Sequence, residues 1–183
     1  VVAMLRTEPD RPIDPQSPPD TESSPGVSAP SAPLYKYEDI LAQNSECIGW
    51  LKIDDTQVNG PVMYSPDEPR KYLNADFFGK YAYSGSFFLD ENCSPDNFDN
   101  LLIHGHRMNN GTMFGELHKY MEPEFWEAHK TFSFDSMYET RTFEVVAVCK
   151  MRVLYVDEEG YDYQLFSKAA DEAEFVEYMD YVR

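Results

Sequence analysis

The sequence predicts a mainly β fold with peripheral helices, in which a mixed sheet closes or curls into a barrel. Short strand-like segments outnumber helical ones, turn residues recur between them, and no internal repeat is visible. The chain has 183 residues, of which 42% are hydrophobic, and this suits one domain of ordinary size with a real core.

The elements of the first half follow from apolar periodicity and from turn residues. In order, the expected elements are a helix at 37–43, a strand at 48–53, a turn at 54–55, a strand at 58–64 and a helix at 65–73. Gly60-Pro61 is expected to interrupt the second strand, and Pro66 suits the first turn of the second helix.

The second half begins with two buried strands. In order, the expected elements are strands at 85–90 and 100–106, helices at 112–120 and 122–130, strands around 132–134 and 142–154, and a helix at 171–182. Met113, Phe114 and Leu117 share one apolar face of the first of these helices, and Pro123 lies in the first turn of the next.

Residues 1–33 differ in composition from the rest of the chain. Residues 6–33 are dominated by proline, serine and acidic side chains, so we expect a disordered linker there. The apolar run 1–5 is too short to span a bilayer, and is either the remnant of a membrane anchor or a surface tail. We expect the folded domain to occupy residues 34–183.

Charge and cysteine content argue against several classes of function. The formal net charge of -18 disfavours nucleic acid and anionic lipid surfaces as partners, because both attract clustered Lys and Arg. The three cysteines, Cys47, Cys93 and Cys149, form no C-x-x-C motif, which argues against a zinc ribbon or a thioredoxin-like site. Their odd number argues against a complete disulfide framework, and one bridge remains open.

The segment from Leu101 to His106 carries the strongest chemical signal. It is an apolar, strand-like run that delivers a histidine to its end, and an imidazole in such a place is a natural proton-transfer group. His104 and His106 share one strand face, which is also a metal-ligand geometry. A third ligand would have to come from His118, His129 or an acid, and no spacing requires one.

Several motifs stand in order around this segment. They are Tyr72-Leu73-Asn74-x-Asp76-Phe77, Gly85-x-Phe87-Phe88-Leu89-Asp90, Asn100-Leu101-Leu102-Ile103-x-Gly105-His106 and Thr112-Met113-Phe114-x-x-Leu117, with Gly49-Trp50-Leu51 upstream and Phe125-x-x-x-His129 downstream. With these motifs the chain resembles the class B sortases, cysteine transpeptidases of bacterial surfaces. The resemblance covers roughly residues 36–183, and several fragments in the family's order are a strong signal.

The resemblance implies a sortase-like closed β-barrel with a Cys, a His and an Arg in a groove on its wall. His106 takes the place of the family's histidine. In the family's chemistry a thiolate attacks the threonyl carbonyl of a C-terminal sorting signal, and an amine of peptidoglycan or of a pilin lysine resolves the thioacyl enzyme. His106 would then be the general acid and base, and the Arg would stabilise the oxyanion. No cofactor is implied, and the expected location is the extracellular face of a bacterial membrane, in the cell-wall zone.

The sequence departs from the family's pattern at its C-terminal end. The T-L-x-T-C strand and the later Arg have no counterpart here, so we expect an incomplete barrel and a chain that is inactive on its own. Cys149 lies in a valine-rich strand, where cysteines are usually inert packing, and Cys47 precedes the first strand. Cys93 lies beside Asp90 and Glu91, whose charge would raise the pKa of its thiol.

Three more residues are candidates for substrate binding. His104 is expected to point into the same groove as His106. Asn74 and Tyr161 lie in regions that resemble the family's signal-binding walls, and the alternatives for them are a turn-stabilising Asn and a surface aromatic residue.

Two rival functions belong to other classes. One is a catalytically inactive sortase-like module that binds sorting signals or wall peptides without cleaving them. The other is a surface metal-binding protein that uses His104 and His106, and calorimetry without zinc or copper uptake would exclude it.

Overall fold

A single mixed sheet organises the protein. The computed structural model describes residues 2–4, 34–96, 101–148 and 150, and residues 173, 174, 176, 177 and 180. Within these residues the strand order is β1-β5-β4-β3-β2-β6-β7, with β3 and β4 parallel and the other pairs antiparallel. The strands are β1 (Val2–Met4), β2 (Cys47–Lys52), β3 (Asn59–Met63), β4 (Phe87–Leu89), β5 (Leu101–His104), β6 (Thr131–Ser136) and β7 (Thr142–Glu144).

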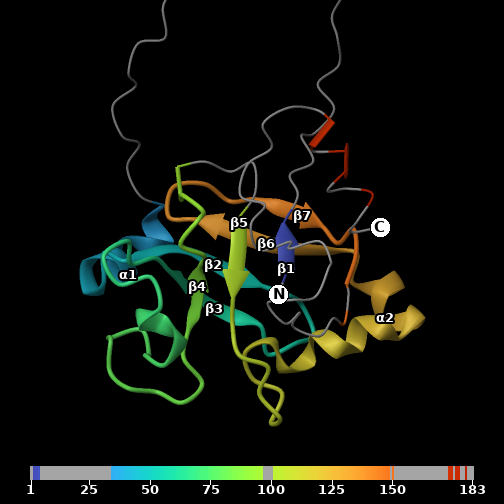
Figure 1. Ribbon diagram of the computed structural model, residues 1–183, viewed down its shortest axis with the longest axis horizontal. Coiled ribbons are helices and arrows are strands. Elements are labelled where there is room, and N and C mark those ends of the chain that lie inside the picture. Colours follow the sequence, from blue (N-terminus) through green and yellow to red (C-terminus); the bar gives the residue numbers. More distant parts are fainter. Residues whose placement is uncertain are drawn as a thin grey trace, which may run out of the picture.

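Short helices border the sheet. They are the 3-10 helices η1 (Tyr35–Tyr37), η2 (Lys71–Leu73) and η3 (Phe114–Met121), and the α-helices α1 (Glu38–Gln43) and α2 (Pro123–Ala128). Figure 1 shows α1 at one end of the sheet and α2 at the other. In the described part of the chain, no helix has both the length and the apolar character needed to cross a membrane.

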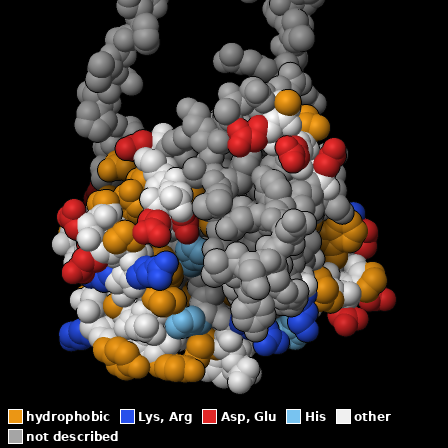
Figure 2. Space-filling view, viewed as in Figure 1, with side chains coloured by type: hydrophobic (Ala, Val, Ile, Leu, Met, Phe, Trp, Pro, Cys, Tyr) orange, Lys and Arg blue, Asp and Glu red, His pale blue; other side chains and the backbone are white. Residues whose placement is uncertain are grey.

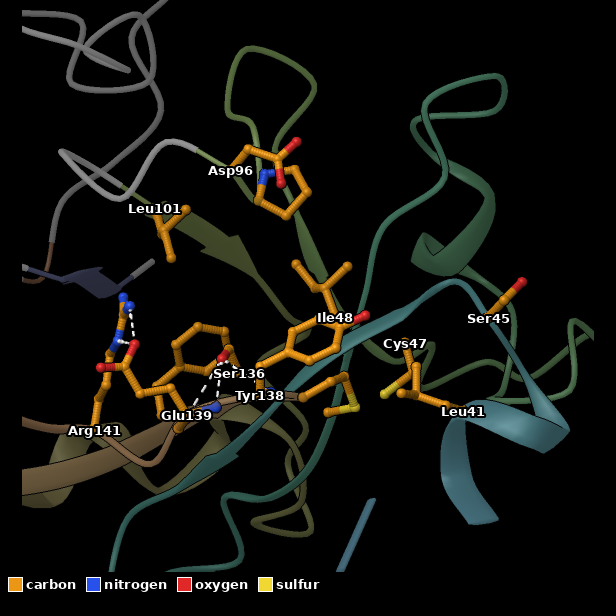
Figure 3. Close-up of a pocket in the computed structure, with 13 residues that line it drawn as sticks. Leu41, Ser45, Cys47, Ile48, Asp96, Leu101, Ser136, Tyr138, Glu139 and Arg141 are labelled. Atoms are coloured by element: carbon orange, nitrogen blue, oxygen red, sulfur yellow. Dashed lines mark hydrogen bonds and ion pairs between the residues drawn. The ribbon is translucent and has the colours of Figure 1, made fainter. Parts of the chain in front are cut away.

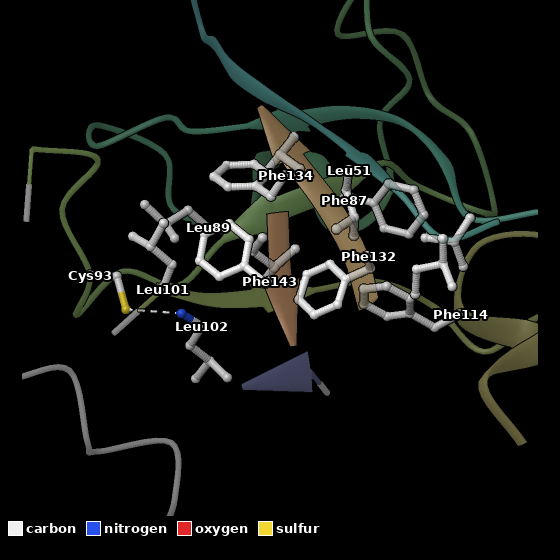
Figure 4. Packing of buried hydrophobic residues seen from close by; sticks show 14 of the residues in the cluster. Leu51, Phe87, Leu89, Cys93, Leu101, Leu102, Phe114, Phe132, Phe134 and Phe143 are labelled. Atoms are coloured by element: carbon white, nitrogen blue, oxygen red, sulfur yellow. Dashed lines mark hydrogen bonds between the residues drawn. The ribbon is translucent and has the colours of Figure 1, made fainter. Parts of the chain in front are cut away.

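Alternate strand residues pack into two apolar clusters, one on each face of the sheet. The larger cluster lies where the sheet curls on itself, and its aromatic side chains converge in Figure 4. It includes Leu51, Phe87, Phe114, Phe132, Phe134 and Phe143. The smaller cluster, under α1 and η2, includes Tyr37, Cys47, Met63, Tyr72, Phe88 and Met137. The predicted mainly β fold with peripheral helices and a curled, incomplete barrel is thereby confirmed.

Two predictions for the first half were wrong. β3 passes through Gly60-Pro61 without interruption, because β4 pairs with β3 only at Val62 and Met63 and Pro61 needs no partner on that side. The helix predicted at 65–73 shrinks to η2. Pro69 lacks an N–H group and restricts Glu68 before it, so the first turn is closed only by the Lys71 N–H, which donates to the Glu68 carbonyl oxygen at 2.9 Å.

In the second half, only Thr142–Glu144 of the strand predicted at 142–154 form β7, whereas 145–148 and 150 are not strand and 149 and 151–154 lie outside the described residues. β6 begins at Thr131, opposite Glu144, and beyond that pair one further backbone hydrogen bond joins the Val145 N–H to the Lys130 carbonyl oxygen at 2.7 Å. The segment predicted as a helix at 112–120 forms the 3-10 helix η3. The described positions within the predicted 171–182 helix are helical. β1 pairs with β5, a strand that the sequence pattern did not indicate.

Candidate functional site

The backbone around His106 is fixed on both sides. β5 ends at His104, and a Cβ atom on the intervening Gly105 would lie 2.8 Å from Cδ1 of Phe87 and 2.9 Å from Cδ2 of Phe114. Only glycine therefore lets the chain leave the strand this close to the core. On the other side, the Phe114 N–H donates to the His106 carbonyl oxygen at 2.9 Å.

His106 is the histidine whose ring is available for chemistry. The ring is half-buried, lies 6.4 Å from the Tyr83 ring between centroids, and has no hydrogen-bond partner within the described residues. Each of the other three histidines has a ring nitrogen at hydrogen-bond distance from a protein oxygen. The pairs are His104 Nε2 with Asp90 Oδ2 (2.7 Å), His118 Nδ1 with Gly115 O (2.8 Å) and His129 Nδ1 with Phe125 O (2.7 Å).

His104 is held in a pair with Asp90, a residue that the sequence reasoning did not connect with it. The His104 ring also packs on Phe88, its partner across β4 and β5, at 5.1 Å between centroids. Burial raises the pKa of Asp90, but hydrogen bonds from His104 and Asn92 outweigh it, so this pKa lies below its ordinary value. The signal that could have revealed this pair is its register: His104 lies opposite Phe88, and Asp90, two residues after Phe88, is its diagonal neighbour if the two strands pair in antiparallel fashion. The predicted contact of His104 with substrate stays a prediction.

The loop between η2 and β4 carries exposed aromatic side chains, one of which, Tyr83, lies beside His106. Phe78, Tyr81 and Tyr83 are 62%, 81% and 73% exposed, and such apolar groups on a surface commonly mark an interaction site. Asn74 starts this loop, is exposed, and accepts a hydrogen bond from the Ala82 N–H through its carbonyl oxygen. Figure 2 shows hydrophobic side chains gathered beside surface histidines on this face. Tyr161 lies outside the described residues.

Neither described cysteine suits a nucleophile. Cys47 lies in a row across the sheet with Met63, Phe88 and His104, three inter-strand spacings from His104, or about 14 Å along the sheet. Its side chain lines a pocket of about 450 Å³ near the start of β5 (Figure 3), and burial raises its thiol pKa to about 11.

Cys93 is also buried, and its Sγ accepts a hydrogen bond from the Leu102 N–H at 3.4 Å (Figure 4). Burial is the main cause that raises its thiol pKa, and the charge of Asp90 adds to it. Both Cys47 and Cys93 are free thiols, and Cys149 lies outside the described residues.

The geometry gives little support to a metal site at His104 and His106. Among the described residues, no group of three or more His, Cys, Asp or Glu side chains is arranged to hold an ion. One ring nitrogen of His104 is already engaged by Asp90. A metal ion normally needs three or more such protein ligands.

Comparison with known proteins gives a consistent result. Sortase B of Listeria monocytogenes is 35% identical over 114 residues, which are 62% of this chain and 46% of that protein. A solved structure of L. monocytogenes sortase B has a TM-score of 0.67 and 30% identity, covering 79% of this chain and 78% of that one. A Staphylococcus aureus sortase B–substrate complex has a TM-score of 0.69 and 25% identity, covering 80% and 65%.

The curled sheet thus has the fold of the sortases, and the His106 ring, which follows β5, has no hydrogen-bond partner among the described residues. No protein-family model matches the chain. Because the chain is 30% identical to the Listeria structure and covers 78% of it, the chain belongs to the class B sortase family. It spans about half the length of the curated relatives that it matches, 46% and 47%.

Proposed function

We propose that this protein is part of a sortase B-type cysteine transpeptidase and that His106 is its general acid and base. One observation carries the proposal: in a family of cysteine transpeptidases, His106 alone among the four histidines has a ring without a hydrogen-bond partner in the described part of the chain. An imidazole can exchange a proton with a substrate only through a nitrogen that is not already bonded to the protein.

The proposed reaction has two steps, and the nucleophile is a cysteine encoded beyond residue 183. In the first step, its thiolate sulfur forms a bond to the threonyl carbonyl carbon of a sorting signal. The C–N bond then breaks, and His106 protonates the departing amine. In the second step, an amine of peptidoglycan or of a pilin attacks the thioester carbon and loses its proton to His106. The C–S bond breaks, a new amide forms, and an arginine of the same downstream region stabilises each oxyanion.

Relatives support both substrates. Sortase B has been solved as a substrate complex of the S. aureus protein and, separately, with triglycine bound, and each covers 80% of this chain at 25% identity. We assign the corresponding peptide wall here to His104 and Asn74, together with Tyr161, which lies outside the described residues. The predicted site of action is the outer face of a bacterial membrane, with residues 34–183 as the enzyme domain and residues 1–33 joining it to a membrane anchor. Val2–Met4 of this joining segment pair with β5 as β1.

The test uses the complete gene product with a fluorogenic sorting peptide and triglycine. His106→Ala is expected to lower turnover by about 100-fold or more, within the range that general acid–base groups contribute, while the circular dichroism spectrum is unchanged. His118→Ala is the matched control, because it removes an imidazole whose Nδ1 is bonded to Gly115 within η3. Turnover by His106→Ala at the rate of this control would refute the role of His106.

The chain of residues 1–183 by itself is expected to bind peptide without transferring it. Among the described residues, Cys47 and Cys93 are both buried with raised thiol pKa values, which disfavours formation of the thioester on either. With Cys149 expected to be inert packing in a valine-rich segment, this observation favours an inactive peptide-binding module for the isolated chain. A thioacyl adduct on either residue, detected by mass spectrometry, would contradict the expectation.

A further inference from the structure

The turn between β2 and β3 is fastened to the segment that follows His106. The backbone N–H of Gln57 donates to Glu116 Oε2 at 2.7 Å, and Lys119 Nζ donates to the carbonyl oxygen of Asp55 at 3.3 Å. His129 Nε2 lies 2.9 Å from Asp55 Oδ2. These contacts join residues 59 to 74 positions apart in the sequence. We refer to these five residues, Asp55, Gln57, Glu116, Lys119 and His129, as the turn clamp.

Opposite charges face one another throughout the turn clamp. Lys119 Nζ lies 2.6 Å from Glu116 Oε1, and hydrogen bonds from Lys119 and from the Gln57 N–H lower the pKa of Glu116. The hydrogen bond with Asp55 raises the pKa of His129, whose ring also stacks on Phe125 at 4.0 Å between centroids.

The turn clamp is connected to His106 through the backbone of Phe114. Glu116 lies two residues after Phe114, whose N–H donates to the His106 carbonyl oxygen. The loop between His106 and Phe114 is also bonded to the turn, because Nε2 of Gln57 donates to the Asn110 carbonyl oxygen at 3.4 Å. Gly111, the next residue in this loop, has a φ of +89°, a conformation that favours glycine. The turn and the loop that follows His106 are therefore joined by hydrogen bonds at both Asn110 and Glu116.

We propose that the turn clamp residues are positioning residues for His106, holding the backbone that presents its imidazole. This inference rests on the proposed function only where it concerns turnover. Each ion pair of the clamp has one partner in contact with water, Lys119 (36% exposed) or Asp55 (83% exposed), and such screened pairs contribute little to the free energy of unfolding. The buried Phe114 and Tyr120 hold η3 on the core instead. Loss of the clamp therefore changes where His106 points more than whether the protein folds.

The first experiment reads geometry in the chain of residues 1–183. Glu116→Ala removes the acceptor of the Gln57 N–H, whereas Glu116→Gln keeps an oxygen there. The matched control is Glu127→Ala, which removes an exposed i,i+3 pair with Lys130 on α2. Amide exchange of Phe114 is expected to accelerate at least tenfold in Glu116→Ala, with a shift of the His106 ring resonances in NMR spectra. Glu116→Gln should show a smaller effect and Glu127→Ala none. Unchanged exchange and resonances in a folded Glu116→Ala variant would overturn the proposal.

The second experiment measures turnover in the complete protein. Displacing a catalytic group by about 1 Å can cost up to about 100-fold in rate, so kcat is expected to fall at least tenfold in Glu116→Ala, with KM within twofold and partial rescue in Glu116→Gln. If kcat is unchanged in an active enzyme, the positioning role is refuted. If the complete protein is inactive although the NMR changes occur, the proposed function fails while the clamp stands.

Discussion

Replacing Asp90 by Asn is expected to lower the free energy of unfolding by about 2 kcal/mol at neutral pH, the range for one hydrogen bond to a charged group. Asp90 Oδ2 lies 2.7 Å from His104 Nε2, while Oδ1 accepts two hydrogen bonds from Asn92. Asn at this position keeps an oxygen for Asn92 but loses the charge that faces the imidazole. Because the two side chains are only 13% and 23% exposed, water screens little of this interaction.

The assay is urea unfolding across pH, with Asp96→Asn as the control at an exposed carboxyl in the same connection between β4 and β5. In a parallel thermal unfolding experiment at pH 7, the Tm of Asp90→Asn should lie roughly 4 to 8 °C below that of the wild type. Because the folded pKa of Asp90 is lowered, its stabilisation is complete above the unfolded pKa, about 3.9, and is lost as the pH falls through the folded value. The wild-type and variant curves should therefore converge in acid.

Two results would refute this reasoning. One is an equal loss of stability in Asp96→Asn at pH 7, which would show that the effect comes from net charge and not from the pair. The other is a difference between wild type and Asp90→Asn that persists at a pH where the Asp90 carboxyl is protonated in both the folded and the unfolded state.

Other predictions concern the core and the thiols. Phe114→Ala removes a side chain that is 3% exposed and packs on Phe87 at 4.8 Å between centroids, so the free energy of unfolding should fall by about 3–5 kcal/mol in urea titrations. A loss below about 1 kcal/mol would show that this ring is not part of the core. Cys47 and Cys93 should react with a thiol reagent at pH 8 only after unfolding, since burial raises both thiol pKa values. Rapid modification of either thiol in the native state would contradict this.

The fold class could be predicted from the sequence, and the sequence also singled out His106 as the candidate site residue. Period-two patterns located β2 and β6, and the apolar run that ends in a histidine located β5 and His106, because burial of alternate residues leaves a clear trace. The residue pattern within one segment was less informative about where a strand ends, because this depends on the strand with which it pairs. The end of β7 at Glu144 depends on where β6 begins, and periodicity within one segment cannot show that.

Contacts between distant segments were beyond the sequence for the same reason. Asp90 and His104 meet only because β4 and β5 are antiparallel neighbours in one particular register. The contact of Asp55 with His129 joins residues 74 positions apart. His106 could be singled out from its residue type and its place after an apolar strand, whereas the contacts around it follow from the topology.

The parallel pairing of β3 with β4 has a consequence for how this surface can change. A parallel pair cannot be joined by a tight hairpin and requires a long crossover, which here is the stretch 64–86. The crossover brings Tyr83 to the side of His106, with 6.4 Å between the ring centroids. Because the exposed residues of the crossover are not paired in the sheet, the surface beside His106 can change in composition while the sheet keeps its register.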